Sequence, residues 1–127
     1  NVDDDVNMPY KNASILVNAG VNVVVSIDGY WQQRNLPFMA GTVAAWGLGK
    51  EKALQTITLN TAKVLGLDKT TGSIEMGKDA TLFISAGDAL DMKTNKVEQA
   101  FIQGRSVSLD NLHKQLDKKF SDKYGIK

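Results

Sequence analysis

Asp28 is the residue of this 127-residue chain that is best placed to do chemistry. It directly follows the β-branched run 21–27 (VNVVVSI) and precedes a glycine and a loop. A carboxylate at the carboxyl end of a buried strand is held rigidly, and it can bind a metal ion or act as a general base. The pattern alone also fits an Asp-Gly turn, in which the aspartate side chain forms a hydrogen bond with its own backbone. On the pattern alone, this turn is the commoner outcome.

The loop after Asp28 carries two aromatic side chains and a cation. Tyr30, Trp31 and Arg34 all lie within the segment 30–35 (YWQQRN). Such side chains could line a substrate pocket, or they could pack against the rim of a larger domain. The sequence leaves both interpretations open.

Other metal-ligand types are scarce in this sequence. His113 is the only histidine and there is no cysteine, which excludes disulfides and thiolate sites. A catalytic metal generally needs about three protein ligands. A lone histidine on an amphipathic surface helix is most often a boundary residue. We therefore expect this chain, taken by itself, to hold no metal and to be catalytically inactive.

The elements that would position Asp28 lie in the first half of the chain. Helices are predicted over 10–19, from Pro37 to Trp46, and over 50–59. The run 21–27 is apolar enough to be covered on both faces, as in a parallel sheet. Such a strand needs parallel neighbours, and no run of similar character follows it. The first half therefore resembles the last unit of a larger α/β sheet or barrel.

The block 58–84 (TLNTAKVLGLDKTTGSIEMGKDATLFI) is predicted to be structural. Asn60 is expected to cap a short helix over 61–65, which Gly66 ends. Turns then lead to a strand over 80–85 that is apolar enough to be covered on both faces. The block contains no obvious nucleophile, base or metal ligand.

The remaining elements are predicted to be short strands and a closing helix. The segments 97–102 and 105–108 flank Gln103-Gly104, which indicates a tight two-residue turn. An amphipathic helix is predicted over 110–124. Its apolar positions are Leu112, Leu116 and Phe120, and its basic positions are Lys114, Lys118, Lys119 and Lys123.

Composition excludes several classes of function. The chain has 15 Lys and Arg against 14 Asp and Glu, so no net field attracts nucleic acid or an anionic membrane. No apolar run approaches the roughly 20 residues of a spanning helix, and no signal peptide is visible. The chain begins at Asn1 with an acidic lead-in, 1–7, so we expect it to be part of something longer. A cytoplasmic and a periplasmic location both stay open.

Together these motifs resemble the C-terminal end of metal-dependent amidohydrolases, and in particular the imidazolonepropionase-like group. The resemblance covers about residues 10–108. The matching parts are the strand ending in Asp28, NLPF at 35–38, AWGL at 45–48, EKAL-x-x-IT-LN-x-AK-x-LGL at 51–67, GSIE-x-GKDA-x-L at 72–82, G-D-x-L at 87–90 and FIQGRSV at 101–107.

The resemblance implies an α/β fold in three parts. Residues 1–66 would be the last α/β unit of an incomplete TIM-type barrel. Residues 67–108 would be the C-terminal strands of a small composite β-sandwich, and 109–127 would be an amphipathic helix. Asp28 would be the aspartate at the end of the eighth barrel strand, which binds a divalent metal, expected to be zinc, and takes a proton from metal-bound water. Tyr30, Trp31 and Arg34 would belong to the substrate-pocket loop.

The resemblance also implies what the parent protein does. It would hydrolyse C–N bonds in small cyclic amides, amidines or dipeptide-like substrates, and this chain would be its C-terminal part. The family's His-x-His pair and further histidines are not in this sequence. The alternative is a non-catalytic α/β module used for assembly or binding. Uncovered sheet edges and apolar surface lead us to expect self-association, by strand pairing or domain exchange.

Overall fold

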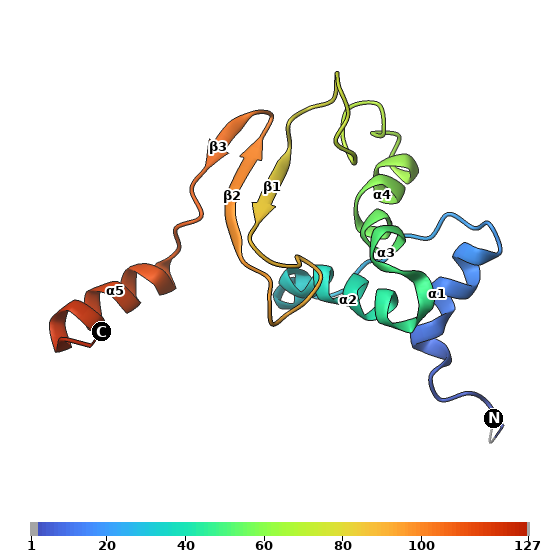
Figure 1. The fold of residues 1–127 in the computed structure, drawn as a ribbon, viewed down its shortest axis with the longest axis horizontal. Helices are drawn as coiled ribbons and strands as arrows, with labels where there is room; N and C mark the ends of the chain where they lie inside the picture. Colours follow the sequence, from blue (N-terminus) through green and yellow to red (C-terminus); the bar gives the residue numbers. More distant parts are fainter. Residues whose placement is uncertain (1–2, 127) are drawn as a thin grey trace.

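The structure is a computed structural model that describes residues 3–126. It has three parts: a group of helices, a small sheet beside them, and a helix at the C-terminal end that projects away from both (Figure 1). The second half has the short antiparallel strands expected of it, whereas the first half is helical and lacks the strand expected at 21–27.

The helical part is built from the first half of the chain and the motif that follows it. Its elements are α1 (Met8–Asn18), the 3-10 helix η1 (Tyr30–Asn35), α2 (Leu36–Val43), the π-helical turn η2 (Ala44–Leu48), α3 (Lys50–Ile57) and α4 (Leu59–Val64). Proline occupies the first turn of both α1 and α2, where its missing N–H costs nothing. The buried core is small and consists of Ala40, Leu48, Ala53 and Leu90.

The single helix expected from Pro37 to Trp46 is in fact interrupted. Regular α-helix ends at Val43, and in η2 the dihedrals of Trp46 (φ −96°, ψ 31°) and Gly47 (φ 103°, ψ 0°) are not helical. The bend brings the Trp46 ring onto Tyr10, with ring centroids 5.4 Å apart. It also turns the Trp46 carbonyl toward the buried Ser14 hydroxyl, which donates to it at 3.1 Å. Tertiary contacts with α1 therefore decide where this helix ends.

The sheet has three antiparallel strands in the order β1-β2-β3. They are β1 (Leu82–Ser85), β2 (Val97–Ile102) and β3 (Arg105–Val107). The predicted tight turn is confirmed, because Gln103 (φ 50°) and Gly104 (φ 76°) both have the positive φ that a type I′ turn requires. The prediction that 80–85 is covered on both faces is wrong for this structure: Phe83 and Ile84 are 50% and 49% exposed.

The predicted strand over 21–27 is also wrong for this structure. Residues 21–28 have no regular secondary structure and pair with no strand of the described part of the chain. The physical reason is that a parallel strand needs parallel neighbours. The three strands of the described residues pair only with each other. The segment lies instead along the helices (Figure 1).

The short helix α4 ends as expected but begins differently. Gly66 (φ 69°) follows its last turn, and the N–H groups of Gly66 and Leu67 donate to the carbonyls of Lys63 and Ala62, which is a Schellman motif. Asn60 is not the N-cap, since the helix begins at Leu59, two residues before the expected start, and its N-cap is Thr58. The Asn60 side chain is used elsewhere, as described below.

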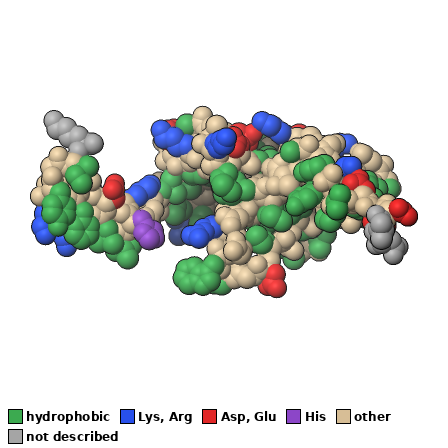
Figure 2. All heavy atoms as spheres, turned by 90° about the horizontal axis from the view of Figure 1, so that it is seen from below, with side chains coloured by type: hydrophobic (Ala, Val, Ile, Leu, Met, Phe, Trp, Pro, Cys, Tyr) green, Lys and Arg blue, Asp and Glu red, His purple; other side chains and the backbone are tan. Residues whose placement is uncertain are grey.

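Helix α5 (Leu112–Tyr124) is formed locally and packs against no other helix or strand of the described chain. The Asn111 side chain accepts a hydrogen bond from the Lys114 N–H, and Gly125 (φ 64°) ends the helix. Its apolar side chains lie open to solvent beside its lysines, in the lobe at the left of Figure 2. Within residues 3–126 no helix has the length and apolar character needed to span a bilayer.

Candidate active-site segment around Asp28

Asp28 lies at the end of the irregular segment 21–28, immediately before η1, and its side chain is exposed. One carboxylate oxygen accepts the N–H of Gly29 at 2.8 Å. This is the local Asp-Gly turn that the pattern alone favoured. The second oxygen makes no hydrogen bond within residues 3–126, so the carboxylate can still accept from another group.

Two hydrogen bonds tie the segment before Asp28 to the corner between α3 and α4. The Val25 N–H donates to the Thr56 carbonyl at 3.2 Å, and the Asn60 side-chain amide donates to the Val23 carbonyl at 3.0 Å. Thr56 is fully buried, and its hydroxyl donates to the Ala53 carbonyl at 2.6 Å. Fixed groups of the helical part therefore hold the segment, in place of a β-ladder.

The three predicted pocket-loop residues follow Asp28 in η1. Tyr30 and Trp31 form an edge-to-face pair with ring centroids 5.2 Å apart, and they are 77% and 76% exposed. Arg34 is exposed on the same element, and it makes no ion pair or side-chain hydrogen bond within the described chain. These side chains adjoin Asp28 along the chain but enclose no cavity with it.

The described residues do not fit a catalytic metal site by themselves. His113 lies exposed on α5, which contacts none of the other elements. Between residues 3 and 126 no three His, Cys, Asp or Glu side chains are grouped so that they could hold a metal ion. Asp28 is thus a single candidate ligand where about three are needed.

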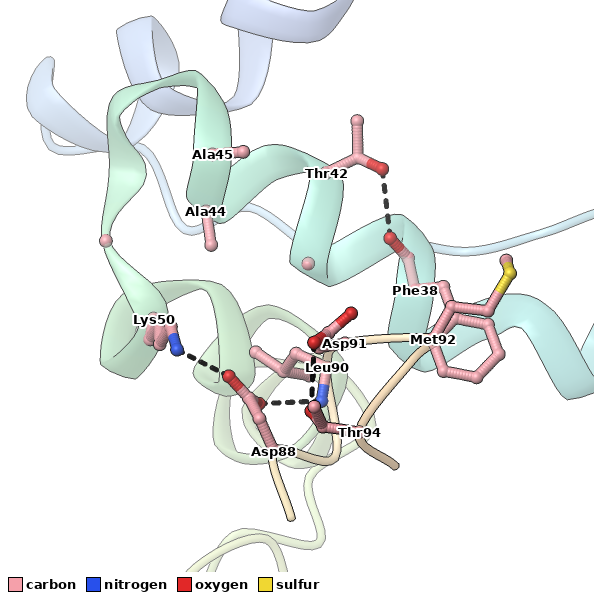
Figure 3. A pocket seen from close by; sticks show the side chains of 12 residues that line it. Phe38, Thr42, Ala44, Ala45, Lys50, Asp88, Leu90, Asp91, Met92 and Thr94 are labelled. Atoms are coloured by element: carbon pink, nitrogen blue, oxygen red, sulfur yellow. Dashed lines mark hydrogen bonds and ion pairs between the residues drawn. The ribbon is translucent and has the colours of Figure 1, made fainter. Parts of the chain in front are cut away.

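A separate hollow of about 760 Å³ lies between α2, the start of α3 and the loop 86–95 (Figure 3). At its edge Lys50 and Asp88 form an ion pair with Nζ and Oδ2 2.6 Å apart. The hydrogen bond from Lys50 lowers the pKa of the Asp88 carboxyl, and a second one from the Leu90 N–H lowers it further. The same ion pair raises the pKa of Lys50.

Asp91, on the same rim, accepts hydrogen bonds from the Lys93 N–H and the Thr94 hydroxyl, which lower its pKa. Sequence reasoning did not single out these acidic residues, although the G-D-x-L motif at 87–90 contains Asp88 and Leu90. The hollow is lined by none of the predicted site residues.

Close backbone contact at the hollow indicates a structural joint between helices and sheet. A side chain at Gly41 would meet the Leu90 carbonyl, because α2 and the loop 86–95 approach each other there without space for a Cβ atom. Leu90 is 8% exposed and belongs to the main core. The loop between β1 and β2 is therefore anchored on α2, which belongs to the same group of helices as the α3–α4 corner that holds the segment before Asp28.

Comparison with known proteins decides the family. The sequence model described as "Amidohydrolase family" matches residues 10–107, which is most of the chain. The chain belongs to the amidohydrolase family. The resemblance found in the sequence, to its imidazolonepropionase-like group, is thereby confirmed.

Individual amidohydrolases agree with this assignment. The imidazolonepropionase of Flavobacterium psychrophilum is 27% identical over 112 residues, covering 80% of this chain and 27% of that protein. The 5-methylthioadenosine/S-adenosylhomocysteine deaminase of Moorella thermoacetica is 38% identical over 80 residues, covering 54% of this chain and 19% of that protein. The crystal structure of an amidohydrolase from Thermotoga maritima superimposes with a TM-score of 0.70 at 34% identity, over 78% of this chain and 26% of that one. The chain thus spans about a quarter of the length of the relatives it matches.

Proposed function

We propose that this chain is the C-terminal part of an amidohydrolase that hydrolyses C–N bonds of small molecules, and that Asp28 is its contribution to the active site. The observation that carries the proposal is the position of Asp28. It is an exposed carboxylate at the end of a segment held by Thr56 and Asn60, and both residues lie inside the family match. A carboxylate at such a position can accept a proton or bind a metal ion.

The proposed architecture divides the chain into three. Residues 1–66 form the end of a barrel, 67–108 the C-terminal strands of a composite β-sandwich, and 109–127 a separate helix. In this proposal 21–27 becomes a barrel strand once parallel neighbours are present. Its apolar composition and its lack of any strand partner among the described residues support this.

The proposed substrates are cyclic amides, amidines or dipeptide-like molecules. Support comes from the names of relatives, which include imidazolonepropionases and a 5-methylthioadenosine/S-adenosylhomocysteine deaminase. Tyr30, Trp31 and Arg34 are proposed to face the substrate from η1. Two exposed rings and a guanidinium without a partner in the described chain suit a planar, polar ligand, because rings stack and Arg donates hydrogen bonds in a fixed plane.

A divalent metal, expected to be zinc, is proposed for the complete enzyme. Asp28 would be one ligand, and the others would come from residues outside the described chain, because those present do not form a ligand group. The chain by itself is then proposed to be inactive. Elemental analysis of the purified 127-residue chain should find no stoichiometric zinc.

The test is a hydrolysis screen of the native protein that contains this chain. Intact-mass measurement first establishes its length. Ring opening is then followed on imidazolone and cyclic amide substrates, release of ammonia on amidines, and release of a free amino acid on dipeptides. Turnover that is lost on chelation and restored by zinc supports the proposal. A native protein without a His-x-His sequence upstream, or without turnover on any C–N substrate, would favour the alternative of a non-catalytic module.

A further inference from the structure

The sheet is attached to the helices at both ends of its first strand, by a contact of Gly72 with α4 and a contact of Leu90 with α2. We infer that these two attachments hold the sheet and the helical part as one rigid body, and that loss of either one lets the sheet swing about the other. Neither contact involves residues 21–28 or the outer edge of a strand, so the inference does not depend on the proposed function.

The strands themselves do not hold the sheet in place. Within the described chain, no Cα atom of β1, β2 or β3 lies within 8 Å of a Cα atom of a helix. In Figure 1 the sheet stands beside the helices and is joined to them through the segments that precede and follow β1. The orientation of the sheet therefore depends on those two segments.

The attachment before β1 is a turn that packs on α4. Gly72 (φ 93°) lies so close to this helix that a Cβ atom on it would be 2.6 Å from the Ala62 methyl group. The turn 70–79 is closed by a hydrogen bond of 2.8 Å, in which the N–H of its last residue donates to the carbonyl of its first. Directly after it, the Ala80 carbonyl accepts the Gly104 N–H at 3.0 Å. The hairpin of β2 and β3 is thus tied through this turn to α4.

The attachment after β1 is the loop 86–95, which carries Leu90 into the core of the helical part. The Leu90 carbonyl occupies the space that a side chain at Gly41 of α2 would need. The ion pair of Lys50 and Asp88 joins the same loop to α3, but an exposed ion pair contributes less than a buried leucine side chain. Leu90 is therefore the residue on which this attachment chiefly depends.

Two attachments fix an orientation that a single one does not. A body held at one point can rotate about that point, whereas contacts at both ends of the four-residue strand β1 prevent the rotation. Closely packed contacts are made or broken as units and do not deform continuously. Loss of one attachment should therefore produce a second orientation of the sheet and not a small shift.

Two spin labels on the 127-residue chain measure this orientation directly. The sequence contains no cysteine, so Lys52→Cys on α3 and Ser106→Cys on β3, both at exposed positions, create the only two labelling sites. Dipolar electron spin resonance then gives the distribution of distances between the two labels. Dilution with unlabelled chain removes distances between molecules. With both attachments intact, the distribution should have one narrow maximum.

Each attachment has a variant and a matched control. Gly72→Ala places a methyl group against Ala62, whereas Gly77→Ala imposes similar backbone strain (φ 88°) with nothing within 4 Å of the new methyl group. Leu90→Ala removes a buried side chain, whereas Met92→Ala shortens a side chain of the same loop that is 70% exposed. Gly72→Ala and Leu90→Ala should each widen the distance distribution by about twofold or more and add a second maximum. Both controls should keep the narrow maximum.

An unchanged distribution in Gly72→Ala or in Leu90→Ala would overturn the inference. So would a broad distribution with both attachments intact, or a control that widens as much as its matched variant. Circular dichroism verifies that each variant keeps its helices. If Leu90→Ala loses them, Leu90→Val takes its place, and if Gly72→Ala loses them, Ala62→Ser crowds the same contact from the side of α4.

Discussion

The side-chain amide of Asn60 lies 3.0 Å from the backbone carbonyl oxygen of Val23, although the two residues are 37 positions apart in the sequence. This contact joins a motif without catalytic groups to the segment that carries the candidate catalytic aspartate. It gives the block 58–84 a physical role in this structure, because its Asn60 side chain holds the backbone that leads to Asp28.

The Val25 amide should exchange its hydrogen more slowly than the amides of Val23 and Val24, because it is the bonded N–H of the three. Removal of the neighbouring anchor in Asn60→Asp should speed its exchange by roughly tenfold, which corresponds to the loss of one hydrogen bond of about 1.4 kcal/mol. Hydrogen exchange followed by NMR on the 127-residue chain measures this. Equal exchange of Val25 in both proteins would mean that the corner does not hold the segment.

Gly41→Ala should destabilise the chain by about 1–3 kcal/mol, since the new methyl group has no room against the Leu90 backbone. Urea denaturation gives the free energy of unfolding. Met39→Ala, at a position 44% exposed on the same helix, is the control and should cost clearly less. A Gly41→Ala protein as stable as the wild type would show that α2 and the loop 86–95 are not in close contact.

The ion pair of Lys50 and Asp88 should give a stability difference that depends on pH. The pKa of Asp88 is lowered in the folded state, chiefly by the Lys50 hydrogen bond, so its stabilisation is present above the unfolded pKa of about 3.9. This stabilisation should be lost as the pH falls through the lower pKa that Asp88 has in the folded state. Asp88→Asn should therefore be less stable than wild type at pH 7, and the difference should shrink as the pH falls below the unfolded pKa. An Asp88→Asn difference that stays constant with pH would contradict the assignment.

Self-association should be visible in sedimentation of the purified chain. The outer edges of β1 and β3 are unpaired within the described residues, and Phe83, Leu112 and Phe120 are between 46% and 65% exposed. Such surface favours association by strand pairing or domain exchange. The sedimentation coefficient should rise with concentration. A truncated chain that ends before residue 109 lacks α5, so association that persists in it would be due to the sheet edges. If the 127-residue chain is a monomer at all concentrations, the prediction is contradicted.

Local signals made the positions of the helices, the helix end at Gly66 and the hairpin turn predictable from the sequence. The hairpin turn at Gln103-Gly104 and the helix end at Gly66 were correct, because each depends on a backbone conformation that few residues adopt. The exposure of Tyr30 and Trp31 was also predicted correctly, although residues 30–35 form the 3-10 helix η1 and not the expected loop.

The errors fell where a distant part of the chain decides the outcome. The run 21–27 has strand composition, but a ladder needs a partner strand and the described chain offers none. The helix expected through Trp46 is broken by contacts with α1, and Asn60 prefers the Val23 carbonyl to a capping role.

The central claim is tested most directly by the turnover of the native enzyme carrying Asp28→Asn, measured beside Asp68→Asn, an aspartate in the turn after α4. Replacing a carboxylate that accepts a proton should lower kcat by at least about 10²-fold, while circular dichroism stays unchanged. Asp68→Asn should retain full activity. Turnover of Asp28→Asn equal to that of the wild type, in a correctly folded protein, would contradict the account.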